Sequence, residues 1–571
     1  MKLPTRVLPL LLFVPLLPAQ VSPEVADLIK KEGLGNSKVM DYLDYLTNTI
    51  GHRLTGSDNF TLACNWAKGE FEKMGLKVHL SKWGEWNVVW NRGQWHGRVV
   101  EPVEMDLQVA TEAWTAGTQG RVRAELIRAS NAEVRDRDER LRGKWILTRR
   151  IPRSREIMAR YLSAKVAGVL YPSTGDAKYP NRIRVFGNPR PFAAQRKLVQ
   201  VCVRRDQFEK LWEMVRVAER SGESVQDASE REGAPAKPAK SQPVLVELDI
   251  RNRFRDEKVV LHNVVADLVG TEHPEERVVV CGHLDSWHQA TGTTDNGTGS
   301  STTLEAARIL STLGVKPRRT IRFILWGGEE QGLLGSLHHV RRYRQEMDKV
   351  SCVFNHDTGT NWAHGLSVTD AMYDDMVKVM APVMTMKAPD PNHKGPVFAL
   401  RKVARFGSGG GSDHASYAAA GVPPFDWHLA GRADYFRFSW HSQWDTFDAA
   451  IPEYQRHTAT VIALAALGVA DLPHLLPRAE RPKPRSDAKP VAEGQLGVDL
   501  DGLKVTGVDS SGIAHAGGMK SGDTIQAING TAVKSVVDLV AAMRDAKAPW
   551  NITVLRDGKQ VGLLLEPKKV P

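Results

Sequence analysis

The segment VVVCGHLD, residues 278–285, joins four apolar residues to a histidine and an aspartate that lie two positions apart. A short apolar run followed by glycine predicts a buried β-strand. The pattern recurs twice: IRFILW (321–326) precedes GGEE, and VSCVF (350–354) precedes NHD. In an open α/β sheet, ligands bind beyond the carboxyl ends of the strands. We therefore expect the polar side chains that follow these three strands to converge in one crevice.

Two further residues extend this set. Asp295 heads a stretch of small residues that is expected to become helical, and His441 lies far downstream in SWHSQWDT (439–446). Imidazole and carboxylate groups bind divalent metal ions. A carboxylate such as that of Asp295 can give one oxygen to each of two ions about 3.5–4 Å apart. The pattern predicts a two-metal hydrolytic site.

The spacing leaves two roles in this site open. Asp285 shares a strand face with His283, so it either binds metal or accepts a hydrogen bond that orients the imidazole. Glu329 and Glu330 would point apart at a strand-to-helix turn. One of them can then bind metal while the other faces the substrate water and acts as a base.

The ordered motifs resemble the family of zinc exopeptidases that includes secreted bacterial leucyl aminopeptidases and carboxypeptidase Q. The resemblance spans about residues 40–472 and rests on GHLDSW (282–287), TDNG (294–297), LWGGEEQG (325–332), SDHAS (412–416) and His441 with Asp445 and Thr446. It implies that Asp295 bridges two zinc ions. It further implies a role for each remaining residue: His283 and Asp357 in one zinc site, Glu330 and His441 in the other, Glu329 as general base, and Asp285 as a support behind the ligands.

One position departs from the family pattern. Aminopeptidases of this type can carry a tyrosine three positions before the Ser-Asp-His motif, where it helps to polarise the substrate carbonyl. This chain has Gly409 there. The candidates for the missing role are Tyr417, Tyr435 and the backbone N–H groups of the glycine run 409–411.

The expected fold class is α/β. A mixed-sheet zinc exopeptidase domain with three α/β/α layers is predicted to comprise residues 20–102 and 253–472. A β-rich insert, residues 103–252, interrupts it and resembles a protease-associated domain through LRGKWIL (141–147) and AKVAGV (164–169). The end of the insert, residues 221–242, is rich in Gly, Ser, Pro and charge, which predicts a loop.

The C-terminal part of the chain is expected to be a separate domain. Residues 473–493 are rich in proline and charge and predict a semi-rigid linker. Residues 494–571 resemble a PDZ domain through GQLGV (494–498), AGGMKSGDTI (516–525) and ING (528–530). This resemblance implies that the loop 494–498 captures the C-terminus of a peptide.

Composition limits the other function classes. Lys and Arg number 77 against 66 Asp and Glu, a formal net charge of +11, but the positive charges are dispersed and no aromatic-basic pattern accompanies them. We therefore expect no nucleic-acid partner. Residues 1–19 combine early positive charge with a short apolar run, which predicts a signal peptide and a secreted or periplasmic protein without a membrane-spanning segment. The four cysteines are widely spaced, which predicts no disulfide framework.

The predicted function is hydrolysis of peptide bonds at the free N-terminus of peptides or dipeptides, by metal-activated water with Glu329 as general base and two zinc ions as cofactors. The hydrolytic residues do not reveal which terminus is recognised, so a carboxypeptidase is one alternative. A glutaminyl cyclase-like acyl transferase is a second alternative, although it would use a single zinc. A catalytically inactive binding protein is a third, and the complete set of expected ligands argues against it. Oligomeric state and side-chain preference cannot be read from the chain.

Overall fold

The computed structural model describes residues 21–189, 193–229, 242–407 and 410–478, together with 496, 498–508, 513–534, 538–539, 542–543 and 549–566. The predicted signal peptide and most of the predicted linker lie outside these ranges. The chain divides into two compact units, residues 1–482 and 483–571. Each unit has a hydrophobic core of its own.

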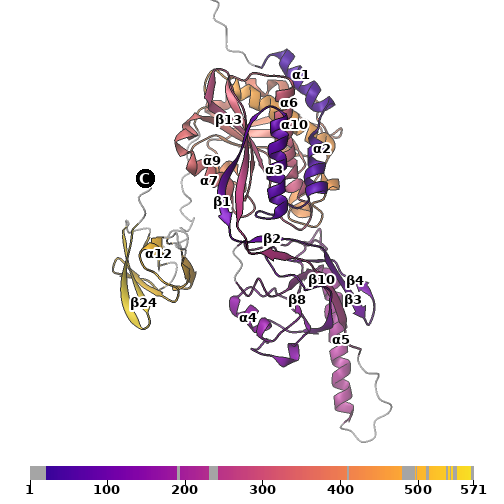
Figure 1. The fold of residues 1–571 in the computed structure, drawn as a ribbon. Coiled ribbons are helices and arrows are strands. Elements are labelled where there is room, and N and C mark those ends of the chain that lie inside the picture. The colour runs from indigo at the N-terminus through magenta and orange to yellow at the C-terminus, as the bar shows by residue number, and fades with distance from the viewer. Residues whose placement is uncertain are drawn as a thin grey trace, which may run out of the picture. The chain divides into compact units, whose positions relative to one another are not determined.

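The central sheet of the first unit, in which Figure 1 labels β1 and β13, is mixed and has six strands in the order β1-β12-β14-β13-β15-β18. The strands are β1 (Lys77–Trp86), β12 (Val259–Leu268), β13 (His273–His283), β14 (Arg319–Trp326), β15 (Val350–Asn355) and β18 (Pro424–Asp426). The pairs β1–β12 and β12–β14 are antiparallel, whereas β14, β13, β15 and β18 pair in parallel. The strand that contains residues 278–283 therefore lies inside the parallel part, between the two other strands predicted to carry site residues.

Helices cover both faces of this sheet. Val278 and Val280 pack into the larger core, whereas Val279 and Cys281 pack into the smaller core on the other face. This division follows the alternation of side chains along a strand. The larger core includes side chains of α1 (Pro23–Gly35), α3 (Asp58–Lys73), α6 (Thr298–Thr312), α8 (Asp370–Met384) and α10 (Pro452–Ala470), and α2 (Val39–Asp44) packs on α6. The smaller core includes side chains of α7 (Leu334–Arg342) and α9 (His414–Ala418). The predicted three-layer α/β fold is confirmed.

Local sequence signals explain several element boundaries. The Ser57 hydroxyl accepts a hydrogen bond from the Phe60 N–H and caps the start of α3, as expected for serine at this position. Gly75 adopts φ 77° after α3, in the left-handed region that glycine occupies without steric cost. A π-helical turn, η3 (Thr293–Gly297), leads directly into α6. A small sheet, in the order β17-β16-β19, is formed by β16 (Trp362–Val368), β17 (Ala399–Lys402) and β19 (His428–Ala430).

A second, eight-stranded sheet occupies the region of the predicted insert. Its order is β4-β3-β10-β6-β7-β8-β9-β5, from β3 (Trp95–Glu101), β4 (Met105–Asp106), β5 (Val109–Ala110), β6 (Val122–Arg128), β7 (Trp145–Leu147), β8 (Gly168–Pro172), β9 (Gln200–Val203) and β10 (Leu245–Ile250). Helices α4 (Arg155–Ser163) and α5 (Arg205–Ser229) accompany it. A separate two-stranded sheet pairs β2 (Val89–Asn91) with β11 (Arg253–Arg255). The domain boundaries at residues 103, 252 and 472 stay predictions.

One loop prediction in this region is wrong in part. Helix α5 continues to Ser229, whereas a loop was expected from Ser221. Glu223, Val225 and Gln226 are tolerated in a helix, and a single glycine costs only about 1 kcal/mol there. The composition of the whole stretch obscured this local continuity. The rest of the predicted loop, residues 230–241, lies outside the described residues.

The second unit contains β20 (Val498–Asp501), β21 (Lys504–Val508), β22 (Thr524–Ile528), β23 (Thr531–Ala532), β24 (Trp550–Arg556), β25 (Lys559–Leu565) and α12 (Ile513–Ala516). The strands form one sheet, in which β23 pairs with β22 at the side. Asn529 and Gly530 form the turn between β22 and β23 with positive φ angles. Across both units, no helix of the described residues is long and apolar enough to cross a membrane. All four cysteines are buried and free.

Candidate active site

Most of the predicted site residues lie at or just after the carboxyl ends of neighbouring parallel strands, and Asp295 and His441 come from helical turns and loops nearby. His283 is the last residue of β13, and Asp357 follows β15 by two positions. Glu329 and Glu330 lie in the turn after β14, and Asp295 lies in η3. His441 comes from the segment after η5 (Tyr435–Ser439) and has φ 56°. Because β14, β13 and β15 run in parallel side by side, their carboxyl ends meet at one edge.

The structure brings the five expected metal ligands together in two groups. One group is His283, Asp295 and Asp357, and the other is Asp295, Glu330 and His441; within each group one ligand atom from every residue lies within 4.8 Å of the others. Asp295 belongs to both groups. Its Oδ1 lies 3.2 Å from His283 Nε2, and its Oδ2 lies 2.9 Å from His441 Nε2. Each carboxylate oxygen of Asp295 therefore faces a different group.

The remaining distances complete the two groups. His283 Nε2 lies 3.6 Å from Asp357 Oδ1, and His441 Nε2 lies 3.1 Å from Glu330 Oε2. His283 Nδ1 is 2.9 Å from the Asp285 carbonyl oxygen, which accepts its hydrogen. That bond directs Nε2 toward the carboxylates, where it is buried without a hydrogen-bond partner. An imidazole nitrogen presented in this way fits a metal ligand.

Asp285 supports the site through both its backbone and its carboxylate. The carboxylate is 3.7 Å from His283 Nδ1, too far for a hydrogen bond, so the carbonyl oxygen of Asp285 orients the imidazole. The carboxylate instead accepts bonds from the Thr55 hydroxyl at 2.8 Å and from the backbone N–H groups of Glu329 and Glu330 at 3.2 and 3.3 Å. It therefore fixes the turn that separates the two glutamates.

Two residues that sequence reasoning did not assign also hold the site. The Asp445 carboxylate accepts the N–H of Thr294 at 2.6 Å and the N–H of Asp295 at 3.2 Å. The buried Arg53 guanidinium donates to the carbonyl oxygens of Leu284 and Gly292, each at 2.7 Å. Asp445 was part of a quoted motif and could have been flagged by its place beside His441. Arg53 carries no local signal for this role, because Leu284 and Gly292 are more than 200 positions away in the chain.

The electrostatics of the site reflect carboxylates crowded away from water. Burial and the neighbouring Asp295 raise the pKa of Glu330 to about 7. Burial raises the pKa of Glu329 well above its usual range, against the opposing effect of His283. Burial would also raise the pKa of Asp295, but the imidazoles of His283 and His441, 3.2 and 2.9 Å away, hold it below its ordinary value. Burial would lower the pKa of His441, but Glu330 and Asp295 raise it to about 9. Such a cluster favours a bound cation.

The two candidate tyrosines differ in position. Tyr417 packs in the smaller core, with its ring centroid 6.1 Å from that of Trp326. Tyr435 is buried, and the nearby charges of Asp295, Asp357 and Glu330 add to burial in raising its pKa. Of the two, Tyr435 is therefore the one close to the ligand groups. Gly409 lies outside the described residues.

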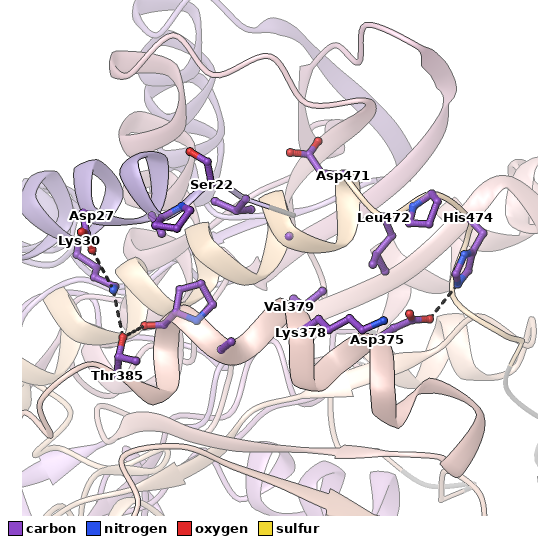
Figure 2. A pocket seen from close by; sticks show the side chains of 17 residues that line it. Ser22, Asp27, Lys30, Asp375, Lys378, Val379, Thr385, Asp471, Leu472 and His474 are labelled. Atoms are coloured by element: carbon purple, nitrogen blue, oxygen red, sulfur yellow. Dashed lines mark hydrogen bonds and ion pairs between the residues drawn. The ribbon is translucent and has the colours of Figure 1, made fainter. Parts of the chain in front are cut away.

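Two cavities of the first unit differ in size and in the residues that line them, and the smaller one lies at the predicted site. A cavity of about 10 Å³ at the group of Asp295, Glu330 and His441 is also lined by Trp287 and Asp445, among others. A much larger cavity, about 940 Å³, lies between α1, α8 and the end of α10 (Figure 2). The residues that line the larger cavity, such as Lys30, Asp375 and His474, include none of the predicted site residues. The small cavity has the space of about one water molecule.

Comparison with known proteins agrees with this geometry. Residues 263–466 match peptidase family M28, and residues 486–555 match the PDZ domain. The chain is 28% identical to carboxypeptidase Q of Mus musculus over 483 residues, which cover 78% of this chain and 88% of the relative. It is 33% identical to carboxypeptidase Q of Rattus norvegicus over 248 residues, 41% of this chain and 49% of the relative.

A solved structure extends the likeness to the fold. The crystal structure of a peptidase M28 precursor from Shewanella amazonensis superposes with a TM-score of 0.56 at 22% identity, covering 81% of this chain and 99% of that one. The fold, the matched segments and the named relatives agree with one another. The segment 263–466 therefore belongs to peptidase family M28, and the chain is a metallo-exopeptidase that carries a C-terminal PDZ domain.

Proposed function

We propose that this metallo-exopeptidase holds two zinc ions and hydrolyses the peptide bond next to a free N-terminus, in peptides or dipeptides. The observation that carries the proposal is the placement of Asp295, whose two oxygens face His283 and His441 separately. In this assignment Asp295 bridges the ions. His283 and Asp357 complete one site, and Glu330 and His441 complete the other.

The residues present fit zinc. Zinc binds imidazole nitrogen and carboxylate oxygen, and a catalytic site leaves a position open for water or substrate. Each proposed site here combines one imidazole with carboxylates, and His283 Nε2 is buried without a hydrogen-bond partner. When bound, a zinc pair would supply Lewis-acid chemistry that lowers the pKa of water and polarises the substrate carbonyl.

We assign the role of general base to Glu329. Its carboxylate belongs to neither ligand group, and its Oε2 lies 3.9 Å from His283 Nε2. The carboxylate therefore stays available to take a proton from the attacking water and to return it to the leaving amine. Glu330, in contrast, is 3.1 Å from His441 Nε2 and accepts the Trp287 N–H at 3.2 Å. These contacts hold Glu330 in a ligand position.

The choice of terminus rests on family resemblance. A free α-amine would lie close to carboxylates such as Asp357 and Glu329, which replace the water that the amine loses on binding. A carboxypeptidase is the main alternative, because the relatives carry that name. A glutaminyl cyclase-like acyl transferase would require only one of the two ligand groups.

One experiment separates these reactions. The full chain is loaded with zinc, its metal content is measured, and it is given a short peptide in free, N-acetylated and C-amidated forms, with products identified by mass. The proposal expects about two zinc ions per chain, release of the N-terminal residue from the free and amidated peptides, and no cleavage of the acetylated one. Release of the C-terminal residue from the acetylated peptide would establish the carboxypeptidase alternative. Full activity with one ion would exclude the dinuclear site.

The PDZ domain is proposed to bind the C-terminus of longer peptides. Most of the loop predicted to capture that terminus, residues 494–498, lies outside the described residues. The unit has its own core, so removing it should preserve hydrolysis of dipeptides and raise KM for long peptides, which lose the effective concentration of a second binding site. Equal kinetics of the full and shortened chains on both peptide lengths would contradict this role.

The export of the protein, expected from the signal-peptide pattern of residues 1–19, also stays a proposal.

A further inference from the structure

The insert places one of its segments directly against the segment that supplies His441. The segment of the insert is residues 176–187, and we call residues 434–445 the His441 segment. Arg184 and Ser442 pair as an isolated antiparallel bridge between the two segments. Three side chains reinforce this contact: Lys178 pairs with Asp434 at 2.6 Å, Arg182 donates to the carbonyl oxygens of Phe436 and Arg437, and Gln443 accepts the Ile183 N–H at 2.8 Å. The insert therefore forms one wall beside the proposed metal groups.

Arg184 is the cation of this wall that lies beside His441. Its Cζ atom lies 4.1 Å from the Trp440 ring centroid and 5.1 Å from that of Phe186. Both aromatic rings also contact His441: their centroids are 4.4 and 5.3 Å from the imidazole centroid. The guanidinium is therefore about one side chain away from a proposed zinc ligand.

The Arg184 guanidinium contacts aromatic rings but has no paired carboxylate among the residues that the structure describes. Its Nε atom is buried without a hydrogen-bond partner. No carboxylate in the described ranges forms an ion pair with it, whereas its neighbours Arg182 and Arg437 lie 3.7 and 3.8 Å from Asp176. Burial and the nearby Arg182 lower the pKa of Arg184. A half-buried guanidinium without an anion is costly unless a ligand completes it.

Arg184 retains a donor for an anion. Its Cζ lies over the Trp440 ring and its Nε has no hydrogen-bond partner, and a guanidinium with free N–H groups can bind a carboxylate through two parallel hydrogen bonds. In a peptide whose scissile carbonyl lies at the metal groups, the next residue extends the chain by only about 3.5 Å. If that residue is the last one, its α-carboxylate falls within the reach of Arg184.

We propose that Arg184 binds the α-carboxylate of the residue on the leaving side of the scissile bond and so makes dipeptides the preferred substrates. The inference rests on the proposed function, because it places the scissile bond at the two ligand groups. It adds a substrate class to that reaction: both termini are read, the amine near the carboxylates and the free acid by the insert. Arg184 is in this sense a residue that determines specificity.

The test compares free acids with amides in the zinc-loaded full chain. Ala-Leu and Ala-Leu amide are hydrolysed by the unaltered chain and by the variants Arg184→Met, Arg184→Lys and Arg437→Met. Arg437 is a matched control, because it belongs to the His441 segment and its side chain is 58% exposed. Ala-Glu amide provides a third substrate, with a side-chain carboxylate in place of the α-carboxylate. Zinc content is measured for every variant.

The unaltered chain is expected to prefer Ala-Leu over its amide by about 10- to 100-fold in kcat/KM, the range of a hydrogen-bonded ion pair. Arg184→Met should remove this preference through KM, with zinc content and amide hydrolysis unchanged. Arg184→Lys should retain part of the preference, and Arg437→Met should retain all of it.

Equal rates for acid and amide in the unaltered chain would overturn the inference and leave the proposed function standing. Equal losses on both substrates in Arg184→Met would also overturn it. A preference for Ala-Glu amide over Ala-Leu would assign the guanidinium to an acidic side chain instead. No hydrolysis of any substrate would instead count against the proposed function.

Discussion

The two ligand groups are built by different parts of the molecule. His283 and Asp357 follow adjacent parallel strands, in which Cys281 is paired with Asn355 by the backbone register. His441 comes from a segment outside the central sheet, and that segment is held by side chains: Arg182 and Gln443 join it to the insert, and Asp445 joins it to the backbone of Thr294 and Asp295. The first group therefore inherits its geometry from the central sheet, whereas the second depends on side-chain contacts, including those with the insert more than 250 positions away in the chain.

This difference concerns robustness. Backbone pairing in a sheet survives most single substitutions, because every neighbouring residue contributes to the register. A segment held by a few side chains can shift when one of them is lost. Metal binding by the group that contains His441 should therefore be the more easily weakened. We call the part of the site that follows the central sheet the sheet side, and the part held against the insert, which includes His441 and Arg184, the insert side. The sheet side should be rigid and the insert side more easily displaced.

The largest effect is expected where the two groups meet. Asp295→Ala should remove zinc from both groups and lower kcat/KM by more than about 10³-fold, because both ions lose a shared ligand and the chemistry depends on them. Elemental analysis after dialysis and kinetics at saturating zinc provide the measurements. His441→Ala is the comparison, since it should weaken one group only. Retention of one tightly bound ion in Asp295→Ala would show that the groups are independent.

A smaller loss is expected from the proposed base. Glu329→Gln keeps the size of the side chain but cannot take a proton, so kcat should fall by about 10²–10⁴-fold with zinc content unchanged. Glu330→Gln is the matched control and should instead lose zinc from the group of His441, because its Oε2 lies 3.1 Å from His441 Nε2. If Glu329→Gln loses zinc and Glu330→Gln retains it, the assignment of the pair is reversed.

The sheet side of the site is also the part that the sequence predicted best. Apolar runs ending in polar residues located three strands, and the rule for α/β sheets placed His283, the glutamate pair and Asp357 at one edge. Asp295 and His441 lie in a turn and a loop, which leave no periodic signal, so the sequence named them as candidates and family resemblance supplied their separate roles. The two ligand groups in the structure contain the five expected residues. Their roles as zinc ligands stay proposals.

The parts that the sequence missed are contacts between distant segments. Arg53, Asp445 and Arg182 each act through backbone atoms of residues far away in the chain, and no local pattern encodes such partners. The Asp285 carboxylate was expected near His283, but it bonds the backbone of the glutamate turn instead. The helix that continues to Ser229 was missed for a different reason, since average composition concealed local helix propensity.

The contact between insert and His441 segment gives a prediction of intermediate size. The Arg182 side chain is buried and donates to the Phe436 and Arg437 carbonyl oxygens. Arg182→Met should leave these acceptors unpaired. It should weaken the binding of zinc to the group of His441 by about 10-fold, as expected for residues that orient ligands. Competition with a graded chelator measures the two affinities separately. Arg123→Met is the control, because its ion pair with Glu101 is about half exposed and such pairs contribute about 0–1 kcal/mol. Equal weakening of both ions would contradict the division of the site.

The smallest effect is expected from a single contact on the sheet side. The buried Thr55 hydroxyl donates to Asp285 Oδ2 at 2.8 Å, and Thr55→Val removes that bond while keeping the shape of the side chain. Asp285 still accepts the N–H groups of Glu329 and Glu330, so the turn should stay in place. We expect a loss of about 1 kcal/mol in unfolding free energy. We expect kcat/KM and zinc affinity to change by only about two- to fivefold, less than the about 10-fold weakening of zinc binding expected for Arg182→Met. Denaturant unfolding, steady-state kinetics and zinc titration measure the three quantities, and Thr61→Val, on the exposed side of α3, is the control. A larger loss of zinc binding in Thr55→Val than in Arg182→Met would contradict the division of the site. Backbone pairing would then not be enough to hold the ligands of the sheet side, which would depend on single side chains as much as the insert side does.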